Sequence, residues 1–124
     1  MATVMVIDNW QSDLLYMELL IKWEGWCAIL LQDATTATQV MSHQLPDLVM
    51  LDWMVSGKVS SQQFIADLKQ NLHTQHIPVI CITAATEVYT RKQLHTCGCD
   101  GYLGKPFSIA QWRAAVMQLI GSHT

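Results

Sequence analysis

A short apolar run that ends at a carboxylate constrains the fold of this chain more than any other feature of its sequence. Residues 48–51 are Leu, Val, Met and Leu, they lie between Pro46 and Gly57, and Asp52 follows them directly. An apolar run without alternation is typical of a strand that is covered on both faces, as in a parallel sheet. Ligands of open parallel sheets bind beyond the carboxyl ends of the strands. Asp52 is therefore a candidate functional residue, although a lone Asp at a strand end is more often a turn or cap residue.

The remainder of the chain alternates strands with helices. Apolar runs predict strands at residues 3–7, 26–31, 48–51, 79–82 and 101–103. Apolar residues at helical spacing predict helices at residues 10–24, 34–41, 60–72, 86–97 and 109–120. This alternation favours parallel βαβ units with right-handed crossovers. We therefore expect an α/β fold with a doubly wound, five-stranded parallel sheet of order 2-1-3-4-5, in a single domain that spans residues 1–124.

The first and last predicted helices have clear end signals. Asn9 or Ser12 is expected to cap the first helix, and Gly25 is expected to end it. Ser108 and Gln111 form a capping box at the start of the last helix. The apolar residues that mark the first helix are Leu14, Leu15, Met17, Leu19 and Ile21. Those expected on one face of the last helix are Ile109, Trp112, Val116 and Leu119.

Composition argues against several classes of protein. Charged residues are 14% of the chain against a usual share of about 25%, and the net charge is −3 without a Lys/Arg cluster. We therefore expect no nucleic-acid partner. No apolar run reaches the length of a membrane span, and the N-terminus lacks the basic segment of a signal peptide, so we expect no membrane association. Because few charges cover the surface, some apolar surface is expected to contact a partner protein.

The four cysteines allow more than one interpretation. Cys27 and Cys81 lie in apolar runs and are expected to be small buried hydrophobic residues. The Cys-Gly-Cys sequence at 97–99, together with His95, gives a weak metal-binding pattern. Its more ordinary interpretation is a helix end followed by a small core residue. We expect reduced thiols and a cytoplasmic protein.

Polar side chains follow four of the five predicted strands. Asp8 and Asn9 follow the first strand, Asp52 the third, Thr83 the fourth and Lys105 the fifth. In a sheet of order 2-1-3-4-5 the first and third strands flank the switch point, so these strand ends converge on one crevice. Each residue alone has an ordinary interpretation as a helix-start anion, a strand end or a surface lysine. Together at one crevice they indicate a functional site.

Several motifs in this order resemble those of the receiver domain of bacterial two-component response regulators. They are Asp8-Asn9, the run Pro-Asp-Leu-Val-Met-Leu-Asp that ends at Asp52, Ile-Pro-Val-Ile-Cys-Ile-Thr-Ala at 77–84, and Gly-Cys-Asp-Gly-Tyr-Leu-Gly-Lys-Pro-Phe at 98–107. The resemblance covers residues 3–120 and implies a flavodoxin-like (βα)5 receiver fold. It also implies a stand-alone regulator similar to the chemotaxis response regulator, which is a signal-transduction protein and not an enzyme.

The resemblance implies that Asp52 is the phosphoacceptor of a phosphorelay. Its carboxylate would take a phosphoryl group from a phosphohistidine on a sensor histidine kinase or a phosphotransfer protein. Asp8, Asn9, Asp52 and the backbone carbonyl of Met54 would hold a Mg2+ ion, which prefers oxygen ligands.

The same resemblance assigns roles to residues on the other side of the acceptor. Lys105 would pair with the phosphoryl oxygens and precede a cis Lys105–Pro106 peptide bond. Thr83 would donate a hydrogen bond to the phosphoryl group, and Tyr102 would be the switch aromatic that fills the space Thr83 leaves. The output face would consist of the fourth helix, the fifth strand and the fifth helix. It would bind a downstream protein or a second copy of the chain.

The chain departs from the family pattern beside the acceptor. The family usually has an acidic residue, the direct metal ligand, where this chain has Asn9, and Trp53 is bulkier than the usual aliphatic neighbour. Residues 55–60, Val-Ser-Gly-Lys-Val-Ser, replace the usual Met-Pro-Gly-Met-Asp-Gly. These changes predict weaker Mg2+ binding and leave open a pseudo-receiver that binds proteins without phosphorylation. An aspartyl-phosphate hydrolase is disfavoured, because Trp53 and Met54 offer no second acid beside the nucleophile.

Overall fold

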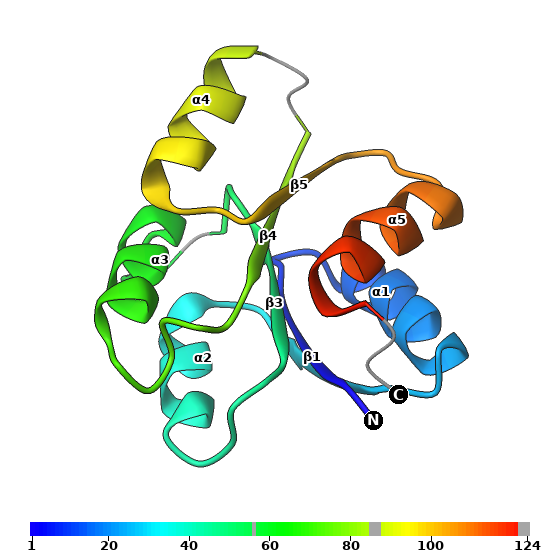
Figure 1. The fold of residues 1–124 in the computed structure, drawn as a ribbon, viewed down its shortest axis with the longest axis horizontal. Helices are drawn as coiled ribbons and strands as arrows, with labels where there is room; N and C mark the ends of the chain where they lie inside the picture. Colours follow the sequence, from blue (N-terminus) through cyan, green and yellow to red (C-terminus); the bar gives the residue numbers. More distant parts are fainter. Residues whose placement is uncertain (56, 85–87, 122–124) are drawn as a thin grey trace.

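The computed structural model describes residues 1–55, 57–84 and 88–121, and strands alternate with helices throughout these ranges (Figure 1). The strands are β1 Thr3–Ile7, β2 Cys27–Leu31, β3 Leu48–Asp52, β4 Val79–Thr83 and β5 Gly101–Gly104. The helices are α1 Gln11–Trp23, α2 Ala34–Met41, α3 Ser61–Gln70, α4 Val88–Cys97 and α5 Ile109–Ile120. The expected start of α4 at residue 86 lies outside the described residues. Within the described ranges, no helix combines the length and the apolar character that a membrane span requires.

All four strand pairings are parallel, and the sheet order is β2-β1-β3-β4-β5, which confirms the predicted topology. The register aligns Ile7 of β1 with Leu51 of β3, and Asp52 at the end of β3 with Ile82 of β4. Thr83, at the end of β4, is aligned with Gly104 of β5. The carboxyl ends of β1, β3, β4 and β5 therefore meet along one edge of the sheet.

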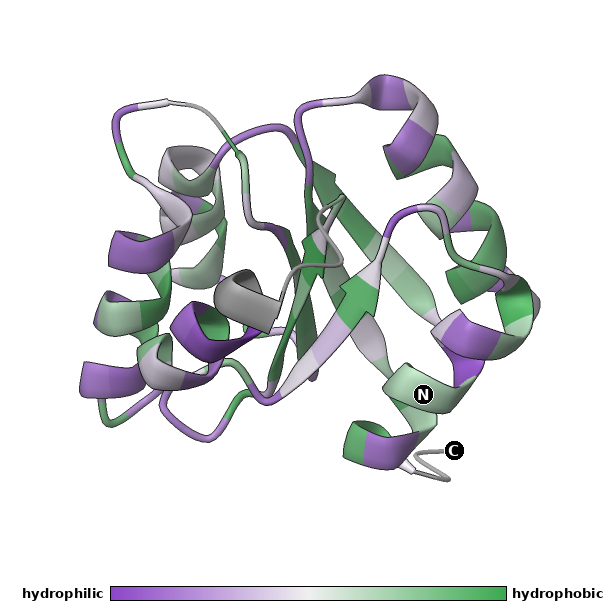
Figure 2. Ribbon diagram, turned by 90° about the horizontal axis from the view of Figure 1, so that it is seen from above, coloured by the Kyte–Doolittle hydropathy of each residue, from purple (hydrophilic) through white to green (hydrophobic). Residues whose placement is uncertain are grey.

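The sheet lies between two layers of helices, with α1 and α5 on one face and α2, α3 and α4 on the other (Figure 1). Met17 and Ile21 of α1 pack with Trp112 of α5 in one hydrophobic cluster. Phe64 and Ile65 of α3 belong to the cluster on the opposite face. Every residue of β3 and β4 is buried, as expected for strands covered on both faces. Figure 2 shows these central strands as strongly hydrophobic segments between the helices.

The start of α1 differs from the prediction. Trp10 is the N-cap residue, and its side chain makes no capping hydrogen bond, so the expectation that Asn9 or Ser12 is the N-cap residue is wrong. The side chain of Asn9 instead makes a tertiary contact. Its amide donates a hydrogen bond to the backbone carbonyl of Met54, in the loop after β3, at 3.2 Å.

The apolar residues of α1 lie on more than one face. The buried residues are Leu14, Met17, Leu20 and Ile21. Leu15 and Leu19, two of the apolar residues that predicted this helix, are 51% and 69% exposed. Trp23 at the end of the helix is 89% exposed. The sheet covers only one side of α1, which therefore presents apolar side chains to solvent.

The capping box of α5 is confirmed by both of its hydrogen bonds, between Ser108 and Gln111. Trp112 and Val116 are buried against the sheet as predicted. Ile109, which was expected on the same face as these two residues, is 60% exposed. This residue is the first of the helix.

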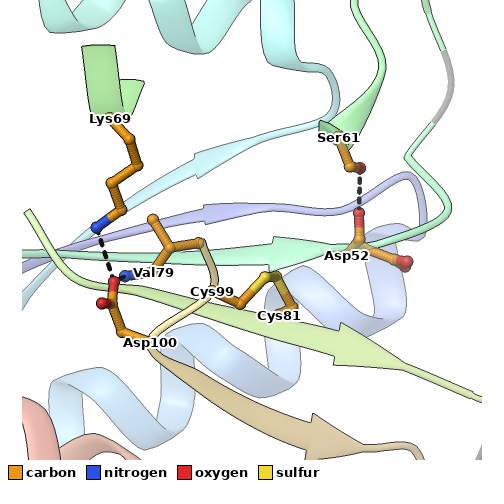
Figure 3. Close-up of a disulfide and its surroundings, with 7 residues drawn as sticks. All are labelled: Asp52, Ser61, Lys69, Val79, Cys81, Cys99 and Asp100. Atoms are coloured by element: carbon orange, nitrogen blue, oxygen red, sulfur yellow. Dashed lines mark hydrogen bonds and ion pairs between the residues drawn. A yellow bond between two sulfur atoms is a disulfide. The ribbon is translucent and has the colours of Figure 1, made fainter. Parts of the chain in front are cut away.

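A disulfide joins Cys81 in β4 to Cys99, which lies just before β5 (Figure 3). The two Cα atoms are 6.3 Å apart across 18 residues of sequence. The expectation of four reduced thiols is therefore wrong for this pair. Cys27 is exposed at the start of the edge strand, so its predicted burial is also wrong. Because Cys99 is bonded to Cys81, it is not a thiolate ligand. Among the described residues, no group of three or more His, Cys, Asp or Glu side chains is arranged to hold a metal ion.

Candidate functional site

The predicted site residues meet at the carboxyl edge of the sheet. Asp8 follows β1, Asp52 ends β3, Thr83 ends β4 and Lys105 follows β5. Asp8 is completely buried, and Asp52 and Thr83 are each 6% exposed. Parallel pairing brings the four strand ends to one place, so residues up to 97 positions apart in sequence become neighbours.

Lys105 links the two buried carboxylates. Its Nζ lies 2.9 Å from Asp52 Oδ2 and 3.0 Å from Asp8 Oδ2. The backbone N–H of Lys105 donates to the carbonyl of Thr83 at 2.7 Å, which extends the pairing of β4 and β5 by one residue. The Lys105–Pro106 peptide bond is cis, as the resemblance implied.

Asp13 is a third partner of Lys105 that the sequence analysis did not identify. Asp13 Oδ2 lies 2.7 Å from Lys105 Nζ, closer than either of the other carboxylates. Asp13 stands in the first turn of α1, where an acid has an ordinary role as a favourable helix-start charge. The sequence offered no distinguishing signal for Asp13, because an acid in the first turn of a helix is common for this electrostatic reason alone.

The charges at this edge alter the pKa values of Asp8 and Lys105. Burial is the main cause that raises the pKa of Asp8, and the charge of Asp52 adds to it. Hydrogen bonds from the Trp10 N–H and from Lys105 oppose this effect without cancelling it. Burial lowers the pKa of Lys105, but the hydrogen bonds to Asp13, Asp52 and Asp8 outweigh burial and raise it above its ordinary value. Lys105 is therefore a firmly protonated ammonium at neutral pH.

The acceptor candidate Asp52 is held at three points. Its Oδ1 accepts a hydrogen bond from the Met54 N–H at 2.8 Å, while its Oδ2 contacts Lys105. The Ser61 hydroxyl donates to the backbone carbonyl of Asp52 at 2.9 Å (Figure 3). Ser61, which is 3% exposed, was not recognised from the sequence. These contacts orient the carboxylate and connect the end of β3 to the start of α3.

The oxygen atoms at this edge fit a hard divalent cation. The carboxylates of Asp8 and Asp52 and the carbonyl of Met54 are ligands of the kind that Mg2+ prefers. The Met54 carbonyl accepts a hydrogen bond from the Asn9 amide, so two of the residues predicted to hold metal also contact each other. These oxygen ligands therefore fit the cation site that the resemblance implied, with one acid fewer beside Asp8 than the family usually has.

A cavity of about 400 Å³ opens above the acceptor. Its lining includes Asp52 and Lys105, together with Trp10, Met54 and the small side chain of Ala84. Trp10 is 65% exposed and Met54 is 73% exposed, so solvent reaches this side of the carboxylate. The cavity leaves room for an incoming group at Asp52.

Tyr102 lies two strands away from the acceptor, with β4 between β3 and β5. It stands in β5, where it is aligned with Cys81 of β4, and its side chain is half-buried. Thr83 lies two residues after Cys81 on the same strand. The predicted switch pair therefore occupies neighbouring strands, and the disulfide partner of Cys81 precedes β5.

Comparisons with known proteins agree on the family. The model of the response regulator receiver domain family matches residues 4–117. The phosphate regulon transcriptional regulatory protein PhoB of Escherichia coli is 38% identical over 84 residues, which cover 68% of this chain and 36% of PhoB. The chain thus spans well under half the length of this curated relative.

Two solved structures are similar in fold. The chemotaxis response regulator CheY4 of Vibrio cholerae has a TM-score of 0.89 and 17% identity, and the match covers 96% of this chain and 98% of that chain. The receiver domain of a sensor histidine kinase from Pseudomonas aeruginosa has a TM-score of 0.87 and 19% identity, with 98% of each chain covered. That structure has a magnesium ion coordinated in its active site cleft.

The two structures show the fold, and the family match extends over nearly the whole chain and includes every strand end described above. The chain therefore belongs to the response regulator receiver domain family of two-component signalling.

Proposed function

We propose that this chain is a cytoplasmic, single-domain response regulator that accepts a phosphoryl group on Asp52. The donor is a phosphohistidine on a sensor histidine kinase or a phosphotransfer protein. One observation carries the proposal: the Lys105 ammonium contacts both Asp8 and Asp52, so the acceptor carboxylate already lies beside a cation that can neutralise a phosphoryl group. The family membership of the chain supports the same chemistry.

The proposed step is a displacement at phosphorus. A carboxylate oxygen of Asp52 forms the new P–O bond, the P–N bond of the phosphohistidine breaks, and its electron pair returns to the imidazole. The protein contributes mainly position and charge to such a transfer. Lys105 would pair with the transferred oxygens, and the Thr83 hydroxyl would donate a hydrogen bond to them. Ala84, which lines the cavity, leaves the approach open.

Asp8, Asp52, the Met54 carbonyl and Asn9 would hold Mg2+ in this proposal. When bound, Mg2+ would neutralise negative charge on the phosphoryl oxygens. The Asp8 carboxyl is buried, its pKa is raised, and it lies near the charge of Asp52, so a cation between the two acids would relieve their repulsion. Asn9 keeps an amide oxygen as a ligand but contributes no charge, so the proposed binding is weak.

In this proposal the chain is a phosphoacceptor and signal carrier, not an enzyme. Phosphorylation adds roughly −1.5 to −2 charges at Asp52. Thr83 would move toward that charge, and the Tyr102 ring would fill the space it leaves, which biases an existing equilibrium between two states. The output face would be α4, β5 and α5, and its partner would be a downstream protein or a second copy of the chain.

The acceptor is tested by labelling with acetyl phosphate and Mg2+, followed by intact-mass measurement. The parent protein should gain one phosphoryl group, and Asp52→Ala should gain none, because the nucleophile is absent. Asp67→Ala removes an exposed carboxylate on α3 and serves as the matched control, which should label like the parent. Equal labelling of the Asp52→Ala variant would show that the acceptor lies elsewhere.

A pseudo-receiver that works without phosphate is the second candidate. The observation in its favour is the Asn9 amide, which replaces the usual acid and donates to the very carbonyl expected to bind metal. In that case the parent would remain unlabelled at saturating acetyl phosphate and Mg2+. Its affinity for its partner would also be the same in the Asp52→Ala variant.

A further inference from the structure

Each of the three N–H donors of the Lys105 ammonium has a carboxylate partner available. A lysine ammonium has three N–H donors and no acceptor. Its three carboxylate partners, Asp13, Asp52 and Asp8, lie at 2.7, 2.9 and 3.0 Å, one for each donor. A phosphoryl oxygen on Asp52 can therefore gain a hydrogen bond from Lys105 only when one of the present contacts is released.

The three partners differ in how firmly they are held. The side chains of Asp8 and Asp52 are 0% and 8% exposed, and each accepts a further backbone hydrogen bond, from the Trp10 N–H and the Met54 N–H. The side chain of Asp13 is 35% exposed, and it stands on α1 rather than at a strand end. Of the three carboxylates, Asp13 can therefore leave Lys105 at the lowest free-energy cost, because water can solvate its charge.

A phosphoryl group changes the balance of charge around this contact. It brings roughly −1.5 to −2 charges and three acceptor oxygens to Asp52. These oxygens attract Lys105 and repel the Asp13 carboxylate, which contacts the same ammonium. Both effects favour an exchange in which Lys105 leaves Asp13 for the phosphoryl group.

From this geometry we propose that Asp13 is a positioning residue that restrains Lys105 in the unphosphorylated site and releases it to the phosphoryl group. Asp13 is thus a competitor for the cation that phosphorylation needs, and it sets how readily Asp52 is modified. The inference rests on the proposed function for the phosphorylated state. The contact itself exists in the unphosphorylated protein.

The test uses beryllofluoride, a phosphoryl analogue that binds to carboxylates, at saturating Mg2+. Tryptophan fluorescence reports binding, because Trp10 lines the cavity above Asp52. Asp13→Asn removes the charge with almost no change in shape, and we expect it to bind the analogue about three- to fivefold more tightly, the factor typical of one partly exposed ion pair. Asp13→Glu retains a carboxylate and should return the affinity toward that of the parent. Asp67→Asn has the same change in net charge without a contact to Lys105 and should match the parent.

A second measurement separates positioning from a general structural effect. With acetyl phosphate at saturating Mg2+, Asp13→Asn should lower the half-saturating donor concentration by a similar factor, while the maximal rate stays within about twofold of the parent. An equal thermal midpoint for parent and variant would verify that the fold is intact.

The outcomes test the role of Asp13 and the proposed function separately. If Asp13→Asn binds beryllofluoride no more tightly than the parent, or if Asp67→Asn gains as much, Asp13 does not restrain Lys105 and the inference is wrong. If the parent binds beryllofluoride but gains no phosphoryl group from acetyl phosphate, the proposed function fails. The affinity ratio between Asp13→Asn and the parent still decides the role of Asp13 in that case.

Discussion

At the scale of single residues, position 9 changes the charge of the site. The family usually places a metal-binding acid there, whereas Asn9 is neutral and its amide binds the Met54 carbonyl. The site therefore lacks one full negative charge beside the expected cation. At separations near 4 Å, a unit charge is worth on the order of 1–4 kcal/mol between bulk-like and surface-like dielectric values. Screening by water and salt favours values toward the low end of that range, and about 1.4 kcal/mol corresponds to a factor of ten in an equilibrium constant.

We therefore predict that Asn9→Asp binds Mg2+ about tenfold more tightly than the parent and is phosphorylated faster. A Mg2+ titration followed by the fluorescence of Trp10 and Trp53 measures the first effect. Asn71→Asp adds the same charge at the end of α3, away from the site, and should leave Mg2+ binding unchanged. If Asn9→Asp binds Mg2+ no better than the parent, position 9 does not contact the metal, and the pseudo-receiver interpretation gains weight.

At the scale of elements, β4 and β5 are connected by a disulfide as well as by their backbone hydrogen bonds. The disulfide between Cys81 and Cys99 closes a segment with a sequence separation of 18 that contains the whole of α4. Asp100 adds a second connection, because its Oδ2 accepts hydrogen bonds from Lys69 Nζ and from the Val79 N–H, each at 2.8 Å (Figure 3). The connection from the end of α4 into β5 is thus bound to both β4 and α3.

We predict that reduction of this disulfide lowers the free energy of unfolding by about 3 kcal/mol, the loop-closure value for a segment of this length. Urea unfolding with and without a reductant measures the difference. The Cys81→Ala/Cys99→Ala double variant should not respond to the reductant, whereas Cys27→Ala/Cys97→Ala, which removes the two free cysteines, should respond like the parent. A count of four reactive thiols in the denatured, unreduced protein would show that the pair is not oxidised.

At the scale of the whole molecule, α1 carries exposed apolar side chains that lie outside the expected output face. Trp23, Leu19 and Leu15 are 89%, 69% and 51% exposed along α1, which lies on the other side of the sheet from α4. The proposed output face instead depends on Tyr102 of β5. These two surfaces can be tested separately because they involve different elements.

We predict that the protein with bound beryllofluoride self-associates more, or binds its partner more tightly, than the free protein, and that Tyr102→Ala abolishes the difference. Sedimentation velocity with and without beryllofluoride measures self-association. Leu19→Gln alters the exposed side of α1 and should leave the difference intact. Loss of the difference in Leu19→Gln but not in Tyr102→Ala would move the output surface to α1.

Much of this architecture follows from local patterns in the chain. Leu48 to Leu51 form an apolar run that is stable only when both of its faces are covered, so the central strand and its helix layers were predictable. Strand–helix alternation allows few topologies, because parallel crossovers are right-handed. Asp8, Asp52 and Lys105 could be placed at one edge for the same reason, since parallel strands end together. Their roles in phosphoryl transfer remain predictions.

Other features depend on where side chains point once the layers have packed. Periodicity showed that α1 is rich in apolar residues, but burial of Leu14 and exposure of Leu15 depend on how the helix is rotated against the sheet. The Asp13–Lys105 contact joins residues 92 positions apart, and the bond between Cys81 and Cys99 depends on strand register. Short-range patterns set which segments become strands and helices, because propensity and capping act within a few residues. Long-range contacts are set by packing, because many sequence-distant groups must satisfy volume, hydrogen bonding and charge at once.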